Sequence, residues 1–227
     1  MPDQLVLYGS PHSQFTYKVA LMLRLAGEAF SFRYISFQKD MHRTQEFRAM
    51  SPWGEVPVLT HGGRTLVQSA AILEYLAATL GKFEGATAEE RQHVREWLYW
   101  DAHRLAPPIH AMYGIHLAGK KLLPIVVEPA IADYHRIRTE AVLAILDERL
   151  AAGRARQGGA FITGAGPTIA DICCYGDVSF AQLSGFTLGI HTNVDRWARL
   201  MTTLRGFKST FDLMPMADAE VGTHLSS

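Results

Sequence analysis

The sequence has very little cysteine, and the positions of the cysteines argue against a structural disulfide. Its 227 residues include two cysteines, Cys173 and Cys174, which are neighbours. Adjacent cysteines rarely pair with each other and no third thiol is present, so the sequence excludes a disulfide framework. We therefore expect a fold held by an apolar core, for which the chain is long enough, and a reducing cytoplasm as its location.

Surplus charge and long hydrophobic runs are also missing. Lys plus Arg and Asp plus Glu each count 22, so the formal net charge at pH 7 is zero. Nucleic acids and anionic membranes favour proteins with a basic face, so we expect neither as a partner. No uncharged apolar stretch reaches about 18 residues, and the beginning of the sequence lacks the pattern of a signal peptide, which argues against a membrane span.

The segment from Leu5 to Ala26 predicts a buried strand, a short polar loop and a helix. Apolar residues open it, a Gly-Ser-Pro turn follows, and apolar positions then recur at helical spacing at Phe15, Val19, Met22, Leu23 and Ala26. Two hydroxyls, Ser10 and Ser13, and the imidazole of His12 stand where the loop becomes the helix. Free N–H groups and the positive end of the helix dipole attract an anion to such a place.

The rest of the first eighty residues alternates between strands and helices. Turn residues and alternating apolar positions predict strands over 30–37, 56–59 and 65–67, the last two joined by a hairpin. A helix is predicted to begin at Gln68-Ser69, because apolar residues follow it at helical spacing. The expected order is β-α-β-α-β-β-α.

Beyond a polar linker at 81–87 the sequence is helical. Helices are predicted over 88–117, with a break or kink at Pro107-Pro108, over 131–150 with Gly153 as the stop, from Asn193 as the cap, and over 205–214. Thr168 and Asp171 have the spacing of a capping box, and we assign them to stability. Residues from 217 onward have few anchors and are expected to be loose.

Four motifs follow one another along most of the chain: YGSPHSQFTYKV, SPWGEVPVL, LVQSAAILEYLA and FITGAGPTIADI. Together they resemble the cytosolic glutathione S-transferase family, and the first is most similar to the serine-type classes. The resemblance implies an α/β, thioredoxin-like domain at 1–80, an all-helical domain at 88–227 and usually a homodimer. It implies glutathione as co-substrate and a small electrophile as the second substrate.

Spacing within the first motif selects one serine. Serine-type members carry the reactive serine five residues before the basic residue of an Arg/Lys-Val pair, and Lys18-Val19 gives that position to Ser13. Glutaredoxins have a cysteine at this spacing and this chain does not, so the thiol must come from the ligand. Ser10 is interpreted as a turn residue. For Ser13 an N-cap role remains open beside the catalytic one, and the two are compatible.

The helix start can ionise a bound thiol. A free thiol has a pKa of about 8.5, so only a few per cent of it is charged at neutral pH. Lowering this pKa by about two units requires roughly 2.7 kcal/mol of preferential stabilisation of the thiolate. A charge-assisted hydrogen bond of about 1.5–3 kcal/mol from Ser13, with up to about 2 kcal/mol from the helix end, is sufficient.

The resemblance also implies residues that bind glutathione. Val56 would pair its backbone with the cysteinyl part, and the Val56–Pro57 peptide bond would be cis. Gln68 and Ser69, at a helix start, can hold the γ-glutamyl carboxylate. His42 and Arg43 resemble a His-Lys pair that binds the glycine carboxylate in some plant members, although a solvated charged loop explains them equally well. Ser51 stands where most members have Asn.

The second-substrate site is the least defined. Candidates are His12, His110, Met112, Tyr113 and Phe211, and ordinary helix packing explains the residues on helices at least as well. The histidines of the helical half do not keep one spacing with acidic partners, so we expect no metal. The sequence predicts a glutathione transferase, with a glutathione-dependent reductase or isomerase, or a non-catalytic protein-binding module, as alternatives.

Overall fold

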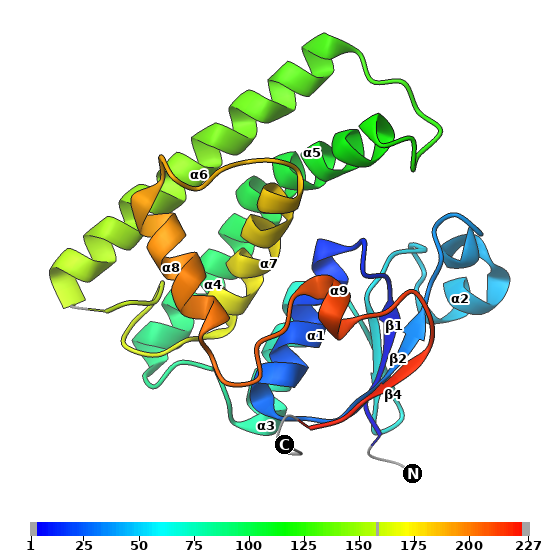
Figure 1. Cartoon of the computed structure of the whole chain (residues 1–227). Helices are drawn as coiled ribbons and strands as arrows, with labels where there is room; N and C mark the ends of the chain where they lie inside the picture. Colours follow the sequence, from blue (N-terminus) through cyan, green and yellow to red (C-terminus); the bar gives the residue numbers. More distant parts are fainter. Residues whose placement is uncertain (1–3, 158, 224–227) are drawn as a thin grey trace. The chain divides into compact units, whose positions relative to one another are not determined.

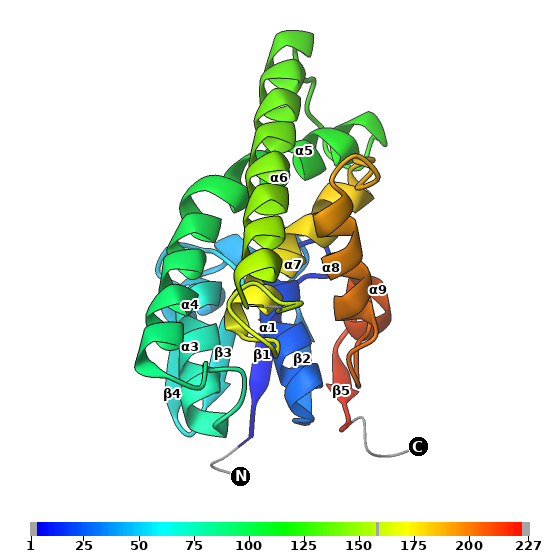
Figure 2. The same ribbon diagram turned by 90° about the vertical axis from the view of Figure 1, so that its left-hand side faces the viewer.

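A five-stranded mixed sheet organises the first of two units in the computed structural model, which describes residues 4–157 and 159–223. The strands are β1 (Val6–Gly9), β2 (Phe30–Tyr34), β3 (Val58–His61), β4 (Arg64–Val67) and β5 (Ala219–Val221). β1 and β2 are parallel, and the other neighbouring pairs are antiparallel. Figure 2 shows them from left to right in the order β4-β3-β1-β2-β5. Together with the helices below, this confirms the expected thioredoxin-like fold.

Helices α1 (Gln14–Ala26) and α3 (Ser69–Leu80) pack against each other and cover one face of the sheet (Figure 1). Val19, Met22, Leu23 and Ala26 of the predicted apolar face are buried, and Phe15 is half-buried. α1 ends at Gly27, whose φ of 80° is left-handed. A 3₁₀ turn, η1 (Met41–Arg43), and the short helix α2 (Gln45–Met50) follow β2. Phe47 of α2 packs with Ile35, Val56 and Val58 in an apolar cluster at the end of the sheet where β2 ends and β3 begins.

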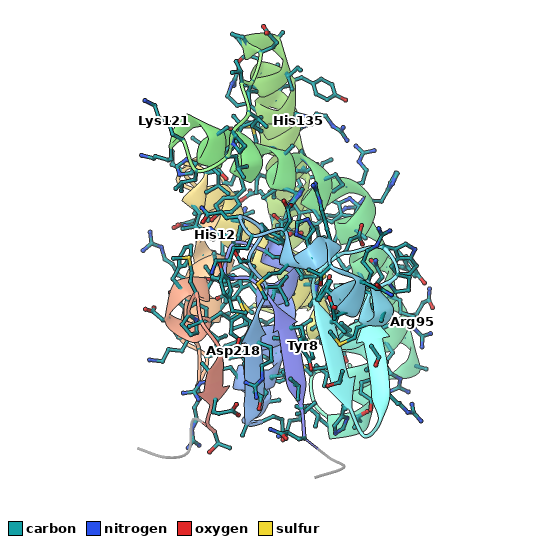
Figure 3. The ribbon with its side chains drawn as sticks, turned by 90° about the vertical axis from the view of Figure 1, so that its right-hand side faces the viewer. Tyr8, His12, Arg95, Lys121, His135 and Asp218 are labelled. Carbon is teal, nitrogen blue, oxygen red and sulfur yellow. The ribbon has the colours of Figure 1, made fainter. Side chains whose placement is uncertain are left out.

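The C-terminal residues depart from expectation. Residues 202–223 belong to the sheet unit, whereas the sequence placed them in the helical domain. The expected helix over 205–214 is reduced to α9 (Thr210–Leu213), and the expected loose tail contains β5, which pairs with β2. Arg33 of β2 forms an ion pair of 2.8 Å with Glu220, and the Tyr34 N–H donates at 2.8 Å to Oδ1 of Asp218, which is labelled in Figure 3. Polar pairing along a sheet edge is not visible in a short C-terminal sequence.

The second unit, residues 83–201, is helical, as expected. Its helices are α4 (Ala88–Trp100), α5 (Ala106–Gly119), α6 (Pro129–Gln157), α7 (Ile169–Leu183) and α8 (Thr192–Thr202). α7 is almost completely buried. Its capping box is present, and in it Asp171 accepts from the Thr168 N–H at 2.9 Å. Asp171 also accepts from the Trp197 indole at 2.9 Å. Within the described ranges, no helix has the length and apolar character needed to cross a bilayer.

The structure bears on three local predictions in this unit. A π-helical turn, Asp101–Leu105, interrupts the first helix directly before Pro107-Pro108. The two prolines lack the N–H groups that would bond back into this turn, so the predicted break is confirmed. The other two predictions were wrong. α6 continues past Gly153, since an isolated glycine only weakens a helix. Asn193 is not the cap of α8, because the carboxylate of Asp147 on α6 accepts the N–H groups of Asn193 and Val194.

Candidate functional site

The sheet register brings four segments to one end of the sheet. β1 ends opposite the start of β3, since Tyr8 pairs with Val58, and β4 ends beside the same point, since Val67 also pairs with Val58. β2 runs parallel to β1 and ends at this edge as well. The loop 10–13, the residues before β3, the residues after β4 and the segment after β2 therefore meet here. These segments carry the predicted glutathione-binding residues.

Ser13 is the N-cap of α1 and is 5% exposed. Its Oγ accepts from the Thr16 N–H at 3.2 Å, and its own N–H donates to the Ser10 carbonyl at 3.0 Å. The capping bond uses an oxygen lone pair, whereas donation to a sulfur would use the hydroxyl proton. The N-cap interpretation is thus confirmed, and it leaves room for the catalytic one.

The neighbours of Ser13 have distinct surroundings. Ser10 is buried, and its Oγ accepts from the His12 N–H at 3.3 Å, which fits a turn residue. Gly9 is required, because a Cβ there would lie 2.1 Å from Thr16 Cγ2. The ring of His12, labelled in Figure 3, meets Phe211 of α9 edge-on with centroids 5.3 Å apart. Burial lowers the pKa of His12, so the imidazole is neutral at pH 7.

The residues before β3 and after β4 are joined by a side-chain contact. The Val56–Pro57 bond is cis, as the resemblance implied. Gln68 Nε2 donates to Glu55 Oε2 at 3.0 Å, and Ser69 begins α3. Gln68 has a φ of 67°, an uncommon value for a side-chain-bearing residue. Glu55 was not among the glutathione-binding residues predicted from the sequence, although its position directly before Val56 placed it beside a predicted one.

Ser51, which stands where most family members have Asn, has a clear structural role. The buried Ser51 Oγ donates to the Glu55 carbonyl at 2.8 Å and accepts from the Glu55 N–H at 3.1 Å. A single hydroxyl thus closes the turn that leads to Val56. The turn does not need Asn at this position.

His42 and Arg43 differ in their contacts. The ring of His42 meets Phe37 edge-on at 5.3 Å, and burial, with the nearby charge of Arg43, lowers the pKa of His42. Its Nδ1 is buried and has no hydrogen-bond partner within the described part of the chain. The His42 carbonyl also lies close to Gly54, where a Cβ would come within 3.0 Å of it. Arg43 has a side chain that is 72% exposed and pairs with Asp40 at 3.4 Å.

The candidates for the second-substrate site fall in different units. Within the sheet unit, His12 and Phe211 are in contact. On α5 of the helical unit, Tyr113 packs against Phe180 with centroids 4.7 Å apart, and burial raises the pKa of Tyr113 to about 12. These contacts show that Tyr113 packs in the core of this unit. His110 is exposed and Met112 is half-buried.

The helical unit also contains a cavity of about 460 Å³ between α4, α6 and the loop after α6. Its lining includes Trp97, Trp100 and Arg149. None of the α5 candidates lines it, so this cavity gives no support to their predicted role.

Comparison with known proteins places these features in a family. Residues 7–82 match the family model described as "Glutathione S-transferase, N-terminal domain". A maleylacetoacetate isomerase of Rhizobium meliloti (strain 1021) is 33% identical over 179 residues, which cover 76% of this chain and 79% of the relative. Glutathione S-transferase 4 of Zea mays is 31% identical over 150 residues, 64% of this chain and 66% of the relative. The crystal structure of a glutathione S-transferase from Xanthobacter autotrophicus Py2 has a TM-score of 0.79 and 25% identity, over 92% of this chain and 98% of that one.

Proposed function

The chain belongs to the cytosolic glutathione S-transferase family, and from that premise we propose that it binds glutathione, ionises its thiol beside Ser13 and transfers the sulfur to an electrophilic carbon. The observation that carries this proposal is the position of Ser13. It is a nearly buried hydroxyl that caps a 13-residue helix at the end of the sheet where the other predicted glutathione-binding residues gather.

The chemistry follows from that position. The Ser13 hydroxyl donates to the glutathione sulfur and keeps its own proton, while the positive end of the α1 dipole favours the negative charge. Together these effects lower the pKa of the bound thiol toward neutrality. The thiol releases its proton to water, and the thiolate attacks the electrophile to form a new C–S bond. The electron pair departs with the leaving group, or it passes into the activated double bond, which then takes up a proton from water.

The surrounding residues suit the two ends of the tripeptide. We propose that the backbone of Val56 pairs with the cysteinyl residue, and that Gln68 and Ser69 hold the γ-glutamyl carboxylate at the start of α3. Glu55, bonded to Gln68, supplies a negative charge for the γ-glutamyl ammonium. His42 and Arg43 take the glycine carboxylate.

A glutathione-dependent isomerase is the second candidate, because the Rhizobium relative bears the name of one. A thiolate that adds reversibly to a conjugated double bond permits rotation and is then released, so glutathione would not be consumed. Depletion of free thiol during turnover supports conjugation, and turnover without depletion supports isomerisation. The expected homodimer, the cytoplasmic location and the reductase and non-catalytic alternatives stay predictions.

The decisive test is a titration of the protein with glutathione in which thiolate absorbance is followed against pH. We expect the wild type to form thiolate well below pH 8.5, and Ser13→Ala to lose about 1.5–3 kcal/mol of this stabilisation, which is roughly one to two pKa units. Thr65→Ala, which removes an exposed hydroxyl of β4, is the control and should keep the wild-type curve. A wild type that does not bind glutathione refutes the function, and an unchanged curve in Ser13→Ala refutes the role of Ser13.

A further inference from the structure

The C-terminal segment, residues 202–223, runs along α1 and is tied to it at several points; we name it the C-terminal strap (Figure 1). The Tyr17 hydroxyl donates to the Lys208 carbonyl at 2.8 Å. At the other end of α1, Arg24 donates through Nε to the Gly206 carbonyl at 3.2 Å and through Nη1 to the Gly222 carbonyl at 2.8 Å. Pairing of β5 with β2 then fixes the strap to the sheet edge.

One contact of the strap reaches the loop that carries Ser13. The Thr210 hydroxyl donates to the Pro11 carbonyl at 3.0 Å, and Thr210 is 4% exposed. Pro11 lies two residues before Ser13, in a loop where the N–H groups of His12 and Ser13 turn inward, to the Oγ and the carbonyl of Ser10. Thr210 therefore attaches this loop to a segment almost two hundred positions away in the sequence.

We propose that Thr210 is a positioning residue for Ser13, and that the strap is a working part of the glutathione site. The inference rests on the proposed function, in which Ser13 donates to the sulfur. A hydrogen bond weakens steeply as its angle and length depart from the optimum. The loop that directs the Ser13 hydroxyl must therefore be held in one geometry, and Thr210 supplies an external hydrogen bond that holds it.

The neighbouring contact supports the same role. Phe211 follows Thr210 directly in α9 and meets the ring of His12, the residue between Pro11 and Ser13. The strap thus touches the loop twice in succession, once through a buried hydrogen bond and once through an aromatic pair. Both contacts converge on the residues that immediately precede Ser13.

The test compares Thr210→Val, which keeps the shape and removes the hydroxyl, with Thr210→Ser, which restores it. In the glutathione complex we expect the valine variant to shift the thiolate titration upward, so that the thiolate fraction near pH 6.5 falls about three- to tenfold. Activity should fall at low pH and approach the wild type at high pH, where the thiol ionises without help. The serine variant should return toward the wild-type profile. Thr65→Val, at an exposed threonine of β4, is the matched control and should not change it.

Amide hydrogen exchange of Ser13 in the free protein provides a readout that does not depend on glutathione. The Ser13 N–H donates to Ser10, and its exchange should accelerate in Thr210→Val and not in Thr65→Val. A valine variant with wild-type exchange and titration overturns the proposal, as does a serine variant that is equally impaired. If the wild type fails to bind glutathione, the proposed function is wrong, and the exchange rates still decide whether Thr210 holds the loop.

Discussion

Gln68 Nε2 donates to Glu55 Oε2 at 3.0 Å and thereby joins the turn before β3 to the start of α3. Both residues are exposed, so the bond contributes little to stability. Gln68 also holds a φ of 67°, which costs a residue with a side chain roughly 1–3 kcal/mol. The weak hydrogen bond to Glu55 does not offset this strain. We infer that the strained conformation serves binding, because it holds the Gln68 amide at a helix start, where a carboxylate would bind.

Replacement of Gln68 by glycine should therefore act in opposite directions on stability and on binding. Glycine tolerates a positive φ better than a residue with a side chain, so Gln68→Gly should relieve part of the strain; we expect the variant to be as stable as the wild type or up to about 1 kcal/mol more stable. The loss of the amide should raise the Kd for glutathione about three- to tenfold. Urea unfolding and calorimetric titration measure the two effects.

The control for this prediction is Gln92→Gly, at an exposed glutamine in the interior of α4. It should lose about 0.5–1 kcal/mol of stability, since glycine weakens a helix interior, and keep its affinity for glutathione. A Gln68→Gly variant that is destabilised to the same extent contradicts the strain argument. One that binds glutathione as the wild type does contradicts the binding role.

The contact between His12 and Phe211 predicts a change in titration. Burial lowers the pKa of His12 from its ordinary value of 6.5, and Phe211 covers one edge of the ring. Phe211→Ala should expose the imidazole, so its pKa should rise toward 6.5. Titration of the imidazole signals by NMR measures this, with His61, which lies against Tyr75 in the same unit, as the internal reference. An unchanged His12 pKa would show that Phe211 does not shield it.

Local sequence patterns predicted the elements whose signal is local. The spacing of apolar residues predicted α1, the Thr168–Asp171 spacing predicted the cap of α7, and the family motif predicted the cis bond before Pro57. In each of these cases, residues a few positions apart carry the information. The sequence could therefore place Ser13 at a helix start without knowledge of the rest of the chain.

Features that depend on distant partners were missed. β5 exists because an edge of β2 is available and Arg33 pairs with Glu220, and the Thr210 bond exists because Pro11 lies opposite it. Neither β5 nor the short helix that contains Thr210 has a hydrophobic periodicity from which these contacts could be predicted. The same limit applies to the second-substrate candidates: helical spacing placed Tyr113 on a helix, but only the fold shows that it packs against Phe180.

The cap of α8 gives a prediction with a defined pH dependence. Burial opposes ionisation of Asp147, but the hydrogen bonds that it accepts from Asn193 and Val194 prevail and hold its pKa below its ordinary value of 3.8. A carboxylate with a lowered folded-state pKa stabilises the protein above its unfolded-state pKa, and this contribution disappears as the pH falls through the folded-state pKa. Asp147→Ala should therefore lose about 0.5–2 kcal/mol at pH 7, the usual range for a lost cap, and progressively less below pH 3.8.

Urea unfolding of the wild type and Asp147→Ala at pH 7 and at pH 3 measures this difference. Asp133→Ala, which removes an exposed carboxylate of the same helix, is the matched control and should change stability by less than about 0.5 kcal/mol at either pH. If the effect of Asp147→Ala is as large at pH 3 as at pH 7, it does not come from the charged cap. Lost packing of the side-chain stem would then explain it, because a packing term does not titrate.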